Sequence, residues 1–449
     1  MVQQRRTGLR AAAGAAVVVV TVGALALAAG AQASSTSPGN APGVTDNRVT
    51  LGFIGSQSGV AAPTQQDSDK ACQARVDAEN AKGGVNGRKI NLEVVDDKSS
   101  GANLTAARDL VENRNAFAVV DNSAFAFLTY RYLKDAGVPM IGGGFDGSYY
   151  YDQGNENIVS GLGGGTPVPG LAYDTPTKVM KQLGAKKIAA LGYGVSPSSS
   201  EAAKATETYA AKAQGLKGVY LNNTVDFGST DVGPLVLGIK NSGADGLYLP
   251  LDNNTNFAIV QSLVQNNVPM KANVMATGYG QTLLDQTAVT QVLTQHDVFQ
   301  TGYRPVELGG AAIKTFRSNL KKYSGITGVP GYGVYTGYIV CDMAIHGLKN
   351  AGENPTRQGF VDGIRKANGG IYDAAGLTCS PLDLSYGNFG KVDKTSCLWF
   401  ATVKDDKFHV LNGGKPFTGK LVGDPALVQK YESSSGNGVA TTTSAAPST

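Results

Sequence analysis

The feature that most constrains the fold of this chain is an alternation of short β-branched runs with longer segments of helical character. The runs typical of strands are 49–54, 90–95, 117–120, 140–141, 188–191, 218–221, 246–249 and 274–276. The helix-length segments between them are 71–81, 103–113, 125–136, 200–213, 232–241 and 256–265. This order favours parallel sheets covered by helices, because a parallel connection must cross over the sheet.

The alternation occurs in two successive sets, and 449 residues with 42% hydrophobic content can supply two soluble cores. After the second set, residues 299–304 have the character of a crossing strand. The segments 311–325 and 334–352 then show apolar residues at the i, i+3, i+4 spacing of amphipathic helices. We therefore predict an α/β protein with two lobes.

The N-terminus has the three parts of a secretory signal peptide. Arginines at positions 5, 6 and 10 precede an uncharged run over 11–29, and Ala31-Gln32-Ala33 is a small-x-small cleavage pattern. We predict a signal peptide over 1–33. The alternative is an uncleaved membrane anchor, since the apolar run has nearly the length that spans a bilayer.

The predicted location is secreted or cell-envelope. No cysteine precedes Cys72, so this junction offers no lipid-anchoring cysteine. Residues 34–46 are rich in Ser, Pro and Gly and are expected to form a flexible lead-in. The segment 426–449 is expected to be a disordered tail, because its final residues lack apolar periodicity.

Charge argues against nucleic acid as a partner. The formal net charge is +4, and removing the three N-terminal arginines leaves +1 (4 − 3), with no long basic run elsewhere. The three histidines are far apart and form no metal-binding pair, so we predict no metal and no cofactor.

Four cysteines in an exported chain favour disulfides. Cys379 and Cys397 bracket a short turn-rich segment, and we predict that they pair. Cys72 and Cys341 both fall on predicted helices, where they can either pair or remain buried thiols.

The segment from Val49 to Asp97 carries a family resemblance. A strand VTLGFI leads into the turn GSQSG, a helix ends in ENAKGGVNGR, and a second strand ends in two acids; later, YLKDAG precedes VPMIGGG. This order resembles the leucine/isoleucine/valine-binding proteins, which are type I periplasmic binding proteins of ABC transporters. The resemblance covers roughly residues 47–420.

The resemblance implies two Rossmann-like lobes joined by a three-strand hinge. Lobe one would comprise 47–158 plus 303–378, and lobe two 159–302 plus 379–425. The function implied is that of a monomeric solute-binding protein of an ABC importer. It would bind a small polar or amino-acid-like ligand between its lobes and, after hinge closure, deliver it to a permease. No catalysis is expected.

Candidate ligand contacts in lobe one follow the strands, because open parallel sheets bind ligands beyond the carboxyl ends of their strands. They are Gln57, Ser58, Ser123, Ala124, Phe125, Gly143, Gly144, Phe145 and Asp146. The resemblance implies that hydroxyl and backbone donors here hold a ligand carboxylate, a role that Ser58 and Ser123 fit. The alternative is that these Gly and Ser residues only serve turns.

Candidate contacts in lobe two are Tyr193, Asp252, Asn253, Gly278 and Tyr279. Amino-acid binders of the family carry an acid after the strand that matches 274–276, but here ATGYGQT follows with no acid. Asp252 or Asp146 could supply the charge, while Tyr193, Tyr279 and Phe145 could stack on a flat ligand. Asp252 could equally be a helix cap.

Two enzyme hypotheses were weighed. Residues 142–147 match G-x-G-x-x-G, but a turn-rich segment follows where a dinucleotide site needs a helix. GSQSG lacks the central serine of a nucleophile elbow. The rival functions that remain are a ligand-sensing receptor of the same fold without transport, and more distantly a secreted hydrolase.

Overall fold

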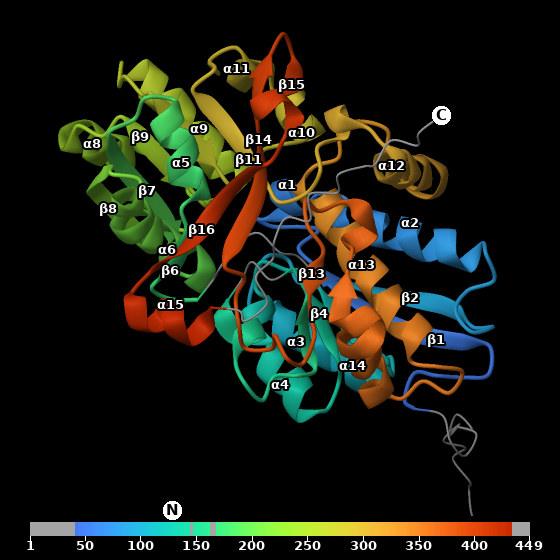
Figure 1. Cartoon of the computed structure of the whole chain (residues 1–449). Coiled ribbons are helices and arrows are strands. Elements are labelled where there is room, and N and C mark those ends of the chain that lie inside the picture. The colour runs from blue at the N-terminus through green and yellow to red at the C-terminus, as the bar shows by residue number, and fades with distance from the viewer. Residues whose placement is uncertain (1–40, 144–146, 162–167, 433–449) are drawn as a thin grey trace, which may run out of the picture. The chain divides into compact units, whose positions relative to one another are not determined.

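The computed structural model describes residues 41–143, 147–161 and 168–432. It contains two α/β units, the first layer and the second layer, each of which consists of one sheet and the helices packed on it (Figure 1). The first sheet is parallel throughout, in the order β2-β1-β3-β4-β5. Its strands are β1 (Arg48–Gly55), β2 (Lys89–Asp96), β3 (Ala118–Asp121), β4 (Met140–Gly142) and β5 (Ile158–Ser160). These layers confirm the predicted α/β fold class.

The helices of the first layer come from both ends of the described chain. From the N-terminal part come α1 (Ala62–Gln65), α2 (Ser68–Asn80), α3 (Ala102–Arg108) with a π turn over Asp109–Asn113, and α4 (Tyr130–Asp135). From the later part come α12 (Ala311–Ser324), α13 (Tyr332–Asn350) and α14 (Arg357–Lys366). Figure 1 shows α13 and α14 beside the first sheet. The two predicted late helices are therefore present, whereas α14 was not predicted.

The second sheet is mixed, in the order β6-β16-β14-β11-β10-β9-β7-β8, with β15 paired to β14. Its strands are β6 (Leu171–Tyr173), β7 (Lys187–Tyr193), β8 (Lys217–Val225), β9 (Gly246–Leu249), β10 (Ala272–Met275), β11 (Asp297–Thr301), β14 (Thr395–Lys404), β15 (Lys407–Val410) and β16 (Phe417–Gly423). The strands β7 to β11 are parallel, but β14 pairs antiparallel with β11, and β16 antiparallel with both β14 and β6. The predicted parallel arrangement is therefore present in the first sheet and in β7 to β11, whereas the antiparallel strands β14 and β16 were not predicted.

The helices of the second layer lie between these strands in the sequence. They are α5 (Thr175–Gln182), α6 (Pro197–Ala205) with a π turn over Thr206–Ala210, α7 (Ala211–Ala213), α8 (Gly233–Ser242), α9 (Asn253–Gln265), α10 (Gln281–Leu284), α11 (Thr287–Thr290) and α15 (Pro425–Tyr431). Short apolar strands between amphipathic helices bury both faces of the sheet, as β9 does with four buried residues in a row.

Helix α13 is the central element of the first layer, because most of its residues are buried. Two glycines allow this: a Cβ on Gly333 would meet the Gln65 carbonyl oxygen at 2.6 Å, and a Cβ on Gly337 would collide with the Ser68 carbonyl. The Cys72–Cys341 disulfide joins α2 to α13. The two helices are therefore packed backbone to backbone and linked covalently.

Three connections pass between the sheets: after β5, after β11, and before β14. The last lies later than the predicted boundary at 378/379. β13 (Leu382–Asp383) pairs with β12 (Ile371–Tyr372), and the Arg365 guanidinium of α14 donates to the Leu384 carbonyl at 3.2 Å. Residues 379–384 therefore pack with the first layer. Ser160 also belongs to the first sheet, two residues beyond the predicted first boundary.

Parts of the two segments predicted to be flexible, residues 41–46 and 426–431, have defined structure. Val44 is buried and forms an isolated bridge with Val49, so residues 41–46 are ordered against the first sheet. Helix α15 occupies part of the predicted tail, with Asp424 accepting from the backbone N–H groups of Ala426 and Leu427. The signal-peptide prediction over 1–33 and the rest of the tail, 433–449, lie outside the described residues.

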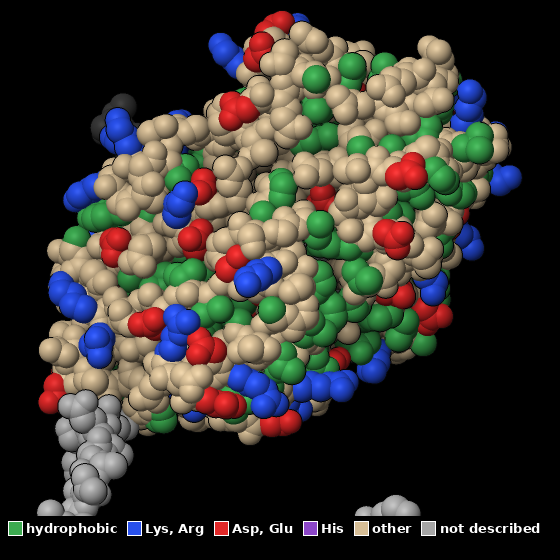
Figure 2. Space-filling model, turned by 180° about the vertical axis from the view of Figure 1, so that it is seen from behind, with side chains coloured by type: hydrophobic (Ala, Val, Ile, Leu, Met, Phe, Trp, Pro, Cys, Tyr) green, Lys and Arg blue, Asp and Glu red, His purple; other side chains and the backbone are tan. Residues whose placement is uncertain are grey.

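The surface carries both signs of charge. Figure 2 shows Lys and Arg side chains interspersed with Asp and Glu over the face opposite to that of Figure 1. Within the described ranges, no helix has the length and apolar character needed to cross a bilayer.

Candidate functional site

A cavity of about 280 Å³ lies where the carboxyl ends of the strands of both sheets approach each other. The second layer supplies most of its wall: Leu171, Ala172, Tyr173, Pro176, Tyr193, Ser196, Ser198, Ser199, Ala202, Thr206, Phe227, Tyr248, Pro250, Leu251, Asp252, Ala276, Thr277, Gln300 and Leu398. The first layer supplies Ala61, Thr64, Gln65, Ala124, Gly143 and Tyr332, the end of β11 supplies Thr301, and the connection after β11 supplies Gly302 and Tyr303. Both lobes therefore enclose the same space.

Six of the wall residues are aromatic, namely Tyr173, Tyr193, Phe227, Tyr248, Tyr303 and Tyr332. Tyr193 meets Phe227 edge-on at 4.8 Å between ring centroids, and Phe227 meets Phe125 at 5.4 Å. Tyr303 stacks on Tyr335 at 4.0 Å. Phe125 belongs to the first layer and Phe227 to the second, so this chain of rings joins the two lobes beside the cavity.

Asp252 lies in the cavity wall and caps α9. Its carboxylate accepts from the backbone N–H of Asn254 at 2.8 Å and of Thr255 at 3.2 Å, and from the Tyr193 hydroxyl. The Thr255 hydroxyl lies 3.1 Å from the same carboxylate, but its proton has a shorter acceptor in the Ser229 carbonyl at 2.8 Å. Burial, together with the Asp252 carboxylate, raises the pKa of Tyr193 above its usual range. Asp252 is therefore a helix cap, as one of the two predictions had it, and it also lines the cavity.

The inner part of the cavity contains an amide beside a phenol. Burial raises the pKa of Tyr248 to about 12, partly offset by a hydrogen bond with the Gln300 side chain. The Oε1 atom of Gln300 is buried and has no hydrogen-bond partner among the described residues. A buried acceptor of this kind costs about 1–3 kcal/mol unless a donor reaches it.

Ser123 does not line the cavity, and its predicted role as a ligand contact is corrected by the structure. The residue is fully buried, and its hydroxyl donates to the Asp97 carboxylate and accepts from the Phe125 backbone N–H at 2.9 Å. Asn103 Nδ2 donates to the same carboxylate at 3.2 Å. The hydroxyl that the prediction assigned to a ligand therefore donates to the buried Asp97 side chain instead.

Gln57 and Ser58 also lie outside the cavity wall. The Ser58 hydroxyl donates to Asp96 at 2.5 Å, and the backbone N–H of Gln57 donates to Asp96 at 3.0 Å. Burial raises the pKa of Asp96, but the hydrogen bonds from Ser58, Lys98 and Gln57 outweigh this and leave it lowered. This turn is held by the acid that ends β2, as the alternative reading of turn residues proposed.

Tyr279, Gly278 and Asn253 were predicted as contacts, and the structure places all three beside the cavity rather than in its wall. Tyr279 is buried, donates its hydroxyl to Glu307 at 2.7 Å and packs on Phe408. Gly278 has φ of 114°, and a Cβ there would meet Phe299 at 2.8 Å. Asn253 starts α9 and faces α1.

The predicted residues that the structure brings into the cavity wall are Ala124, Gly143, Tyr193 and Asp252. Phe125 touches the wall through Phe227. Gly144, Phe145 and Asp146 lie outside the described residues. Sequence reasoning missed Tyr248 and Gln300, which lie inside strands; the signal available was a polar-tipped residue within each of two largely apolar runs, GLYL and DVFQ.

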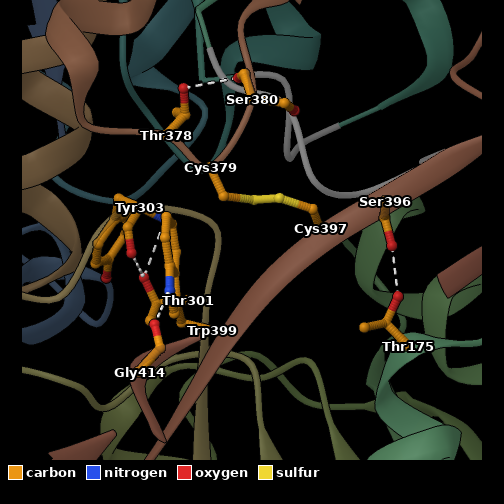
Figure 3. Close-up of a disulfide and its surroundings, with 10 residues drawn as sticks. All are labelled: Thr175, Thr301, Tyr303, Thr378, Cys379, Ser380, Ser396, Cys397, Trp399 and Gly414. Carbon is orange, nitrogen blue, oxygen red and sulfur yellow. Dashed lines mark hydrogen bonds between the residues drawn. A yellow bond between two sulfur atoms is a disulfide. The ribbon is translucent and has the colours of Figure 1, made fainter. Parts of the chain in front are cut away.

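The connection that returns the chain to the second sheet is tied by a disulfide. Cys379 pairs with Cys397 of β14, as Figure 3 shows. The predicted pair is therefore present, and Cys72 pairs with Cys341 as well. Close to it, Tyr303 N–H donates to the Thr301 hydroxyl at 3.1 Å. The connection after β11 is therefore held by a hydrogen bond and the connection before β14 by a disulfide, and both lie close to the cavity.

Comparison with known proteins places these features in context. The family described as "Periplasmic binding protein" matches residues 48–407. A curated relative, the Leu/Ile/Val-binding protein homolog 7 of Brucella abortus, is 27% identical over 329 residues, which cover 69% of this chain and 78% of the relative.

Three solved structures illustrate the likeness of fold. The fatty acid ABC transporter substrate-binding protein from Thermomonospora curvata has a TM-score of 0.68 at 18% identity, covering 84% of this chain and 94% of its own. A solute-binding protein from R. palustris in complex with 4-hydroxybenzoate has 0.68 at 19%, covering 85% and 100%. The Streptococcus pneumoniae LivJ protein in complex with isoleucine has 0.65 at 19%, covering 82% and 99%.

Proposed function

The chain belongs to the periplasmic binding proteins, and on this premise we propose that it is the solute-binding protein of an ABC importer. The observation that carries the proposal is the cavity, whose wall combines Thr64 and Gln65 of the first layer with Tyr193 and Asp252 of the second. A pocket shared by two lobes is enclosed only when the lobes approach each other. Ligand binding and lobe closure are then one event.

Closure requires contacts that exist only in the closed state. The structure supplies candidates away from the wall: the Thr282 hydroxyl of α10 donates to Gln66 Oε1 at 2.9 Å, and the backbone N–H of Gln281 donates to the Val329 carbonyl at 2.8 Å. The free energy of ligand binding would favour this arrangement over an open one. A permease can then recognise the loaded protein by its closed form.

The role proposed is binding without catalysis. Among the described wall residues the titratable side chains are tyrosines and Asp252, and the Asp252 oxygens already accept from three donors, the Tyr193 hydroxyl and two backbone N–H groups. A general base needs a free lone pair at the reacting proton. A secreted hydrolase is therefore the less favoured alternative, and a panel of ester, amide and glycoside substrates tests it through saturable turnover.

The remaining features of the proposal concern location and assembly. A signal peptide over 1–33 and release into the cell envelope suit delivery to a permease, and the protein is proposed to act as a monomer. The lobes are proposed as 47–160 plus 303–384 and 168–302 plus 395–425, adjusted from the sequence by the pairings of β5, β13 and β14. A sensing receptor of the same fold is the alternative in which no permease is engaged.

A thermal-shift screen of residues 34–449 tests the proposal. A ligand at 100 times its Kd should stabilise the protein by about 2.7 kcal/mol. Ala124→Trp fills the cavity and should abolish the shift, whereas Ala288→Trp, at an exposed position in the second layer, should preserve it. A shift that Ala124→Trp leaves intact contradicts binding in this cavity. Stimulation of a reconstituted permease by the loaded protein separates transport from sensing.

A further inference from the structure

We propose that the cavity takes an uncharged ligand with an apolar body and at least one hydrogen-bond donor, an inference that rests on the proposed function. This chemistry differs from that of an amino acid, which carries both an ammonium and a carboxylate. It also narrows the sequence-based expectation of a small polar or amino-acid-like ligand. Four features support the proposal: the charge of the described wall residues, the donors already bound to Asp252, the apolar side chains that face inward, and the unpaired acceptor of Gln300.

The charge of the wall disfavours anionic ligands. Asp252 is the one residue with a formal charge among the described wall residues. The internal segments that the structure does not describe, 144–146 and 162–167, contain no Lys, Arg or His in the sequence. A carboxylate in this cavity would lose its hydration, find no cationic partner and face another carboxylate. Burying an unpaired charge in this way is costly.

The saturation of Asp252 disfavours cationic ligands. A carboxylate has about four lone-pair positions, and three of them accept here from two backbone N–H groups of α9 and the Tyr193 hydroxyl. The Thr255 hydroxyl lies beside the fourth at 3.1 Å, although its proton has a shorter acceptor in the Ser229 carbonyl at 2.8 Å. An ammonium would have to displace one of these donors, at the expense of the helix cap or of the buried tyrosine. Neither sign of charge therefore has a prepared partner.

The apolar body of the ligand is indicated by the side chains that face inward. In β9, Leu247 and Leu249 pack into the core shared with α8 and α9, while Tyr248 points to the opposite face of the sheet, toward Val298 and Leu398. The cavity follows this face, since Tyr248, Leu398 and Pro176 all line it. It therefore extends past the strand ends between the sheet and α5, as a recess for a flat or linear hydrocarbon.

The donor on the ligand is indicated by Gln300. Its amide is engaged by Tyr248, yet its Oε1 atom is buried without a partner among the described residues. Gln300 is half-buried and lines the cavity, so a rotation of its side chain would turn this acceptor toward a hydroxyl, amide or similar N–H group on the ligand and satisfy it. A site that must pair a buried acceptor discriminates strongly against analogues lacking the donor.

Among the described wall residues, the start of α6 is a place where an anion could be held instead. Its N-terminal donors are already partly used: the Ser196 hydroxyl accepts from the Ser199 backbone N–H at 3.3 Å, and the Ser199 hydroxyl donates to the Pro250 carbonyl at 2.6 Å. The Ser199 hydroxyl also accepts from the Tyr193 backbone N–H at 2.9 Å. These bonds serve the protein itself, which leaves the uncharged ligand as the better match.

Isothermal titration at pH 7 with four ligands that share a phenyl ring tests the inference: benzamide, benzoate, benzylamine and methyl benzoate. A second set, hexanamide, hexanoate, hexylamine and methyl hexanoate, tests a linear body. In at least one set, the amide should bind about tenfold or more tightly than its acid, amine and ester. Acid or amine as the tightest binder in both sets overturns the inference but leaves a solute receptor in place.

Two variants test the residues invoked. Asp252→Asn removes the charge and retains a good cap, so it should reduce the preference for amide over acid about fivefold or more, whereas the exposed Asp226→Asn should not. Gln300→Leu should remove the preference for amide over ester, with the exposed Gln291→Leu as its control. Equal effects in variant and control contradict the assignment.

Failure of the inference and failure of the proposed function give different results. If neither set binds while the protein unfolds cooperatively, the inference fails for these bodies, and the broad screen described above decides the proposed function separately. A response in that screen confined to charged solutes overturns the inference. A flat response to every class overturns the function as well.

Discussion

The backbone N–H of Asn253 donates to the Thr64 hydroxyl at 3.0 Å, which joins the start of α9 in the second layer to α1 in the first. The Asn253 side chain adds a bond to the Pro63 carbonyl at 3.4 Å. These contacts lie at the edge of the cavity and depend on the approach of the two lobes. They allow closure to be weakened by a change of one functional group.

Thr64→Val keeps the shape of the side chain and removes the acceptor. The Asn253 N–H would then be buried without a partner on closure, a cost of about 1–2 kcal/mol, so ligand affinity should fall about tenfold. Thr64→Ser retains the hydroxyl and is the matched control. Titration of both variants with the best ligand from the screen checks this, and equal affinities would show that the bond does not contribute to closure.

Tyr193→Phe should destabilise the second layer. The change removes a donor from the buried Asp252 carboxylate, and hydrogen bonds to charged groups contribute about 1.5–3 kcal/mol. Urea unfolding of the ligand-free protein should show a loss of this size, while Tyr209→Phe, on the half-buried π turn after α6, should show little change. An unchanged midpoint for Tyr193→Phe would mean that the cap alone holds Asp252.

Ser123→Ala should affect stability rather than ligand affinity. Its hydroxyl donates to Asp97, and both residues are fully buried. Loss of this donor should reduce the free energy of unfolding by about 1–3 kcal/mol and leave the Kd nearly unchanged. Ser58→Ala, which affects an exposed hydroxyl bonded to Asp96, is the comparison. A large loss of affinity with normal stability would restore the original prediction for Ser123.

Asp393 should make the folded state less stable as the pH rises from about 4 to about 6. Burial and then the Asp383 carboxylate raise the pKa of Asp393 to about 6, whereas an unfolded aspartate has about 3.9. The unfolded chain therefore ionises first, and up to about 3 kcal/mol is lost across this window and not regained above it.

Asp393→Asn should remove this slope, so the variant should exceed the parent in stability at pH 7 and approach it near pH 4. The exposed Asp231→Asn serves as the control. Chemical unfolding at several pH values measures the difference. A constant offset between parent and variant across the range would rule out the titration.

The two disulfides should contribute unequally. Cys72 and Cys341 are 269 positions apart, and Cys379 and Cys397 are 18 apart. In the chain-entropy model the longer loop contributes about 5 kcal/mol and the shorter about 3. Replacing each pair with alanines and comparing urea midpoints checks the order, and mapping of non-reduced peptides checks the pairing. A greater loss from the shorter loop would contradict the entropic account.

The strands that sequence reasoning found are those that form continuous apolar runs between helices. β9 was predicted at its observed bounds, because GLYL is buried on both faces. β14 and β16 were missed, since they follow no helix and pair antiparallel with partners distant in the sequence. Such a pairing cannot be predicted from the hydrophobic pattern of the strand itself.

The cavity could be predicted only where its wall follows strand ends, as at Tyr193 and Asp252. Tyr248 and Gln300 escaped because the face of the sheet on which a strand residue lies depends on the register of its neighbours. Ser123 was misassigned because Asp97, distant by 26 positions, competes for its hydroxyl. Which polar group serves the fold and which serves a ligand is decided by such distant partners.

The bond between Cys72 and Cys341 also sets an order of events during synthesis. Because the chain emerges from its N-terminus, Cys72 must wait for 268 further residues, among them β6 to β11 of the second sheet, before its partner exists. Until then α2 lacks α13, against which it packs. A nascent first lobe is thus unfinished while much of the second is already available to fold, and exchange of the Cys72 thiol with a disulfide of another molecule would hold it in that state as a mixed disulfide.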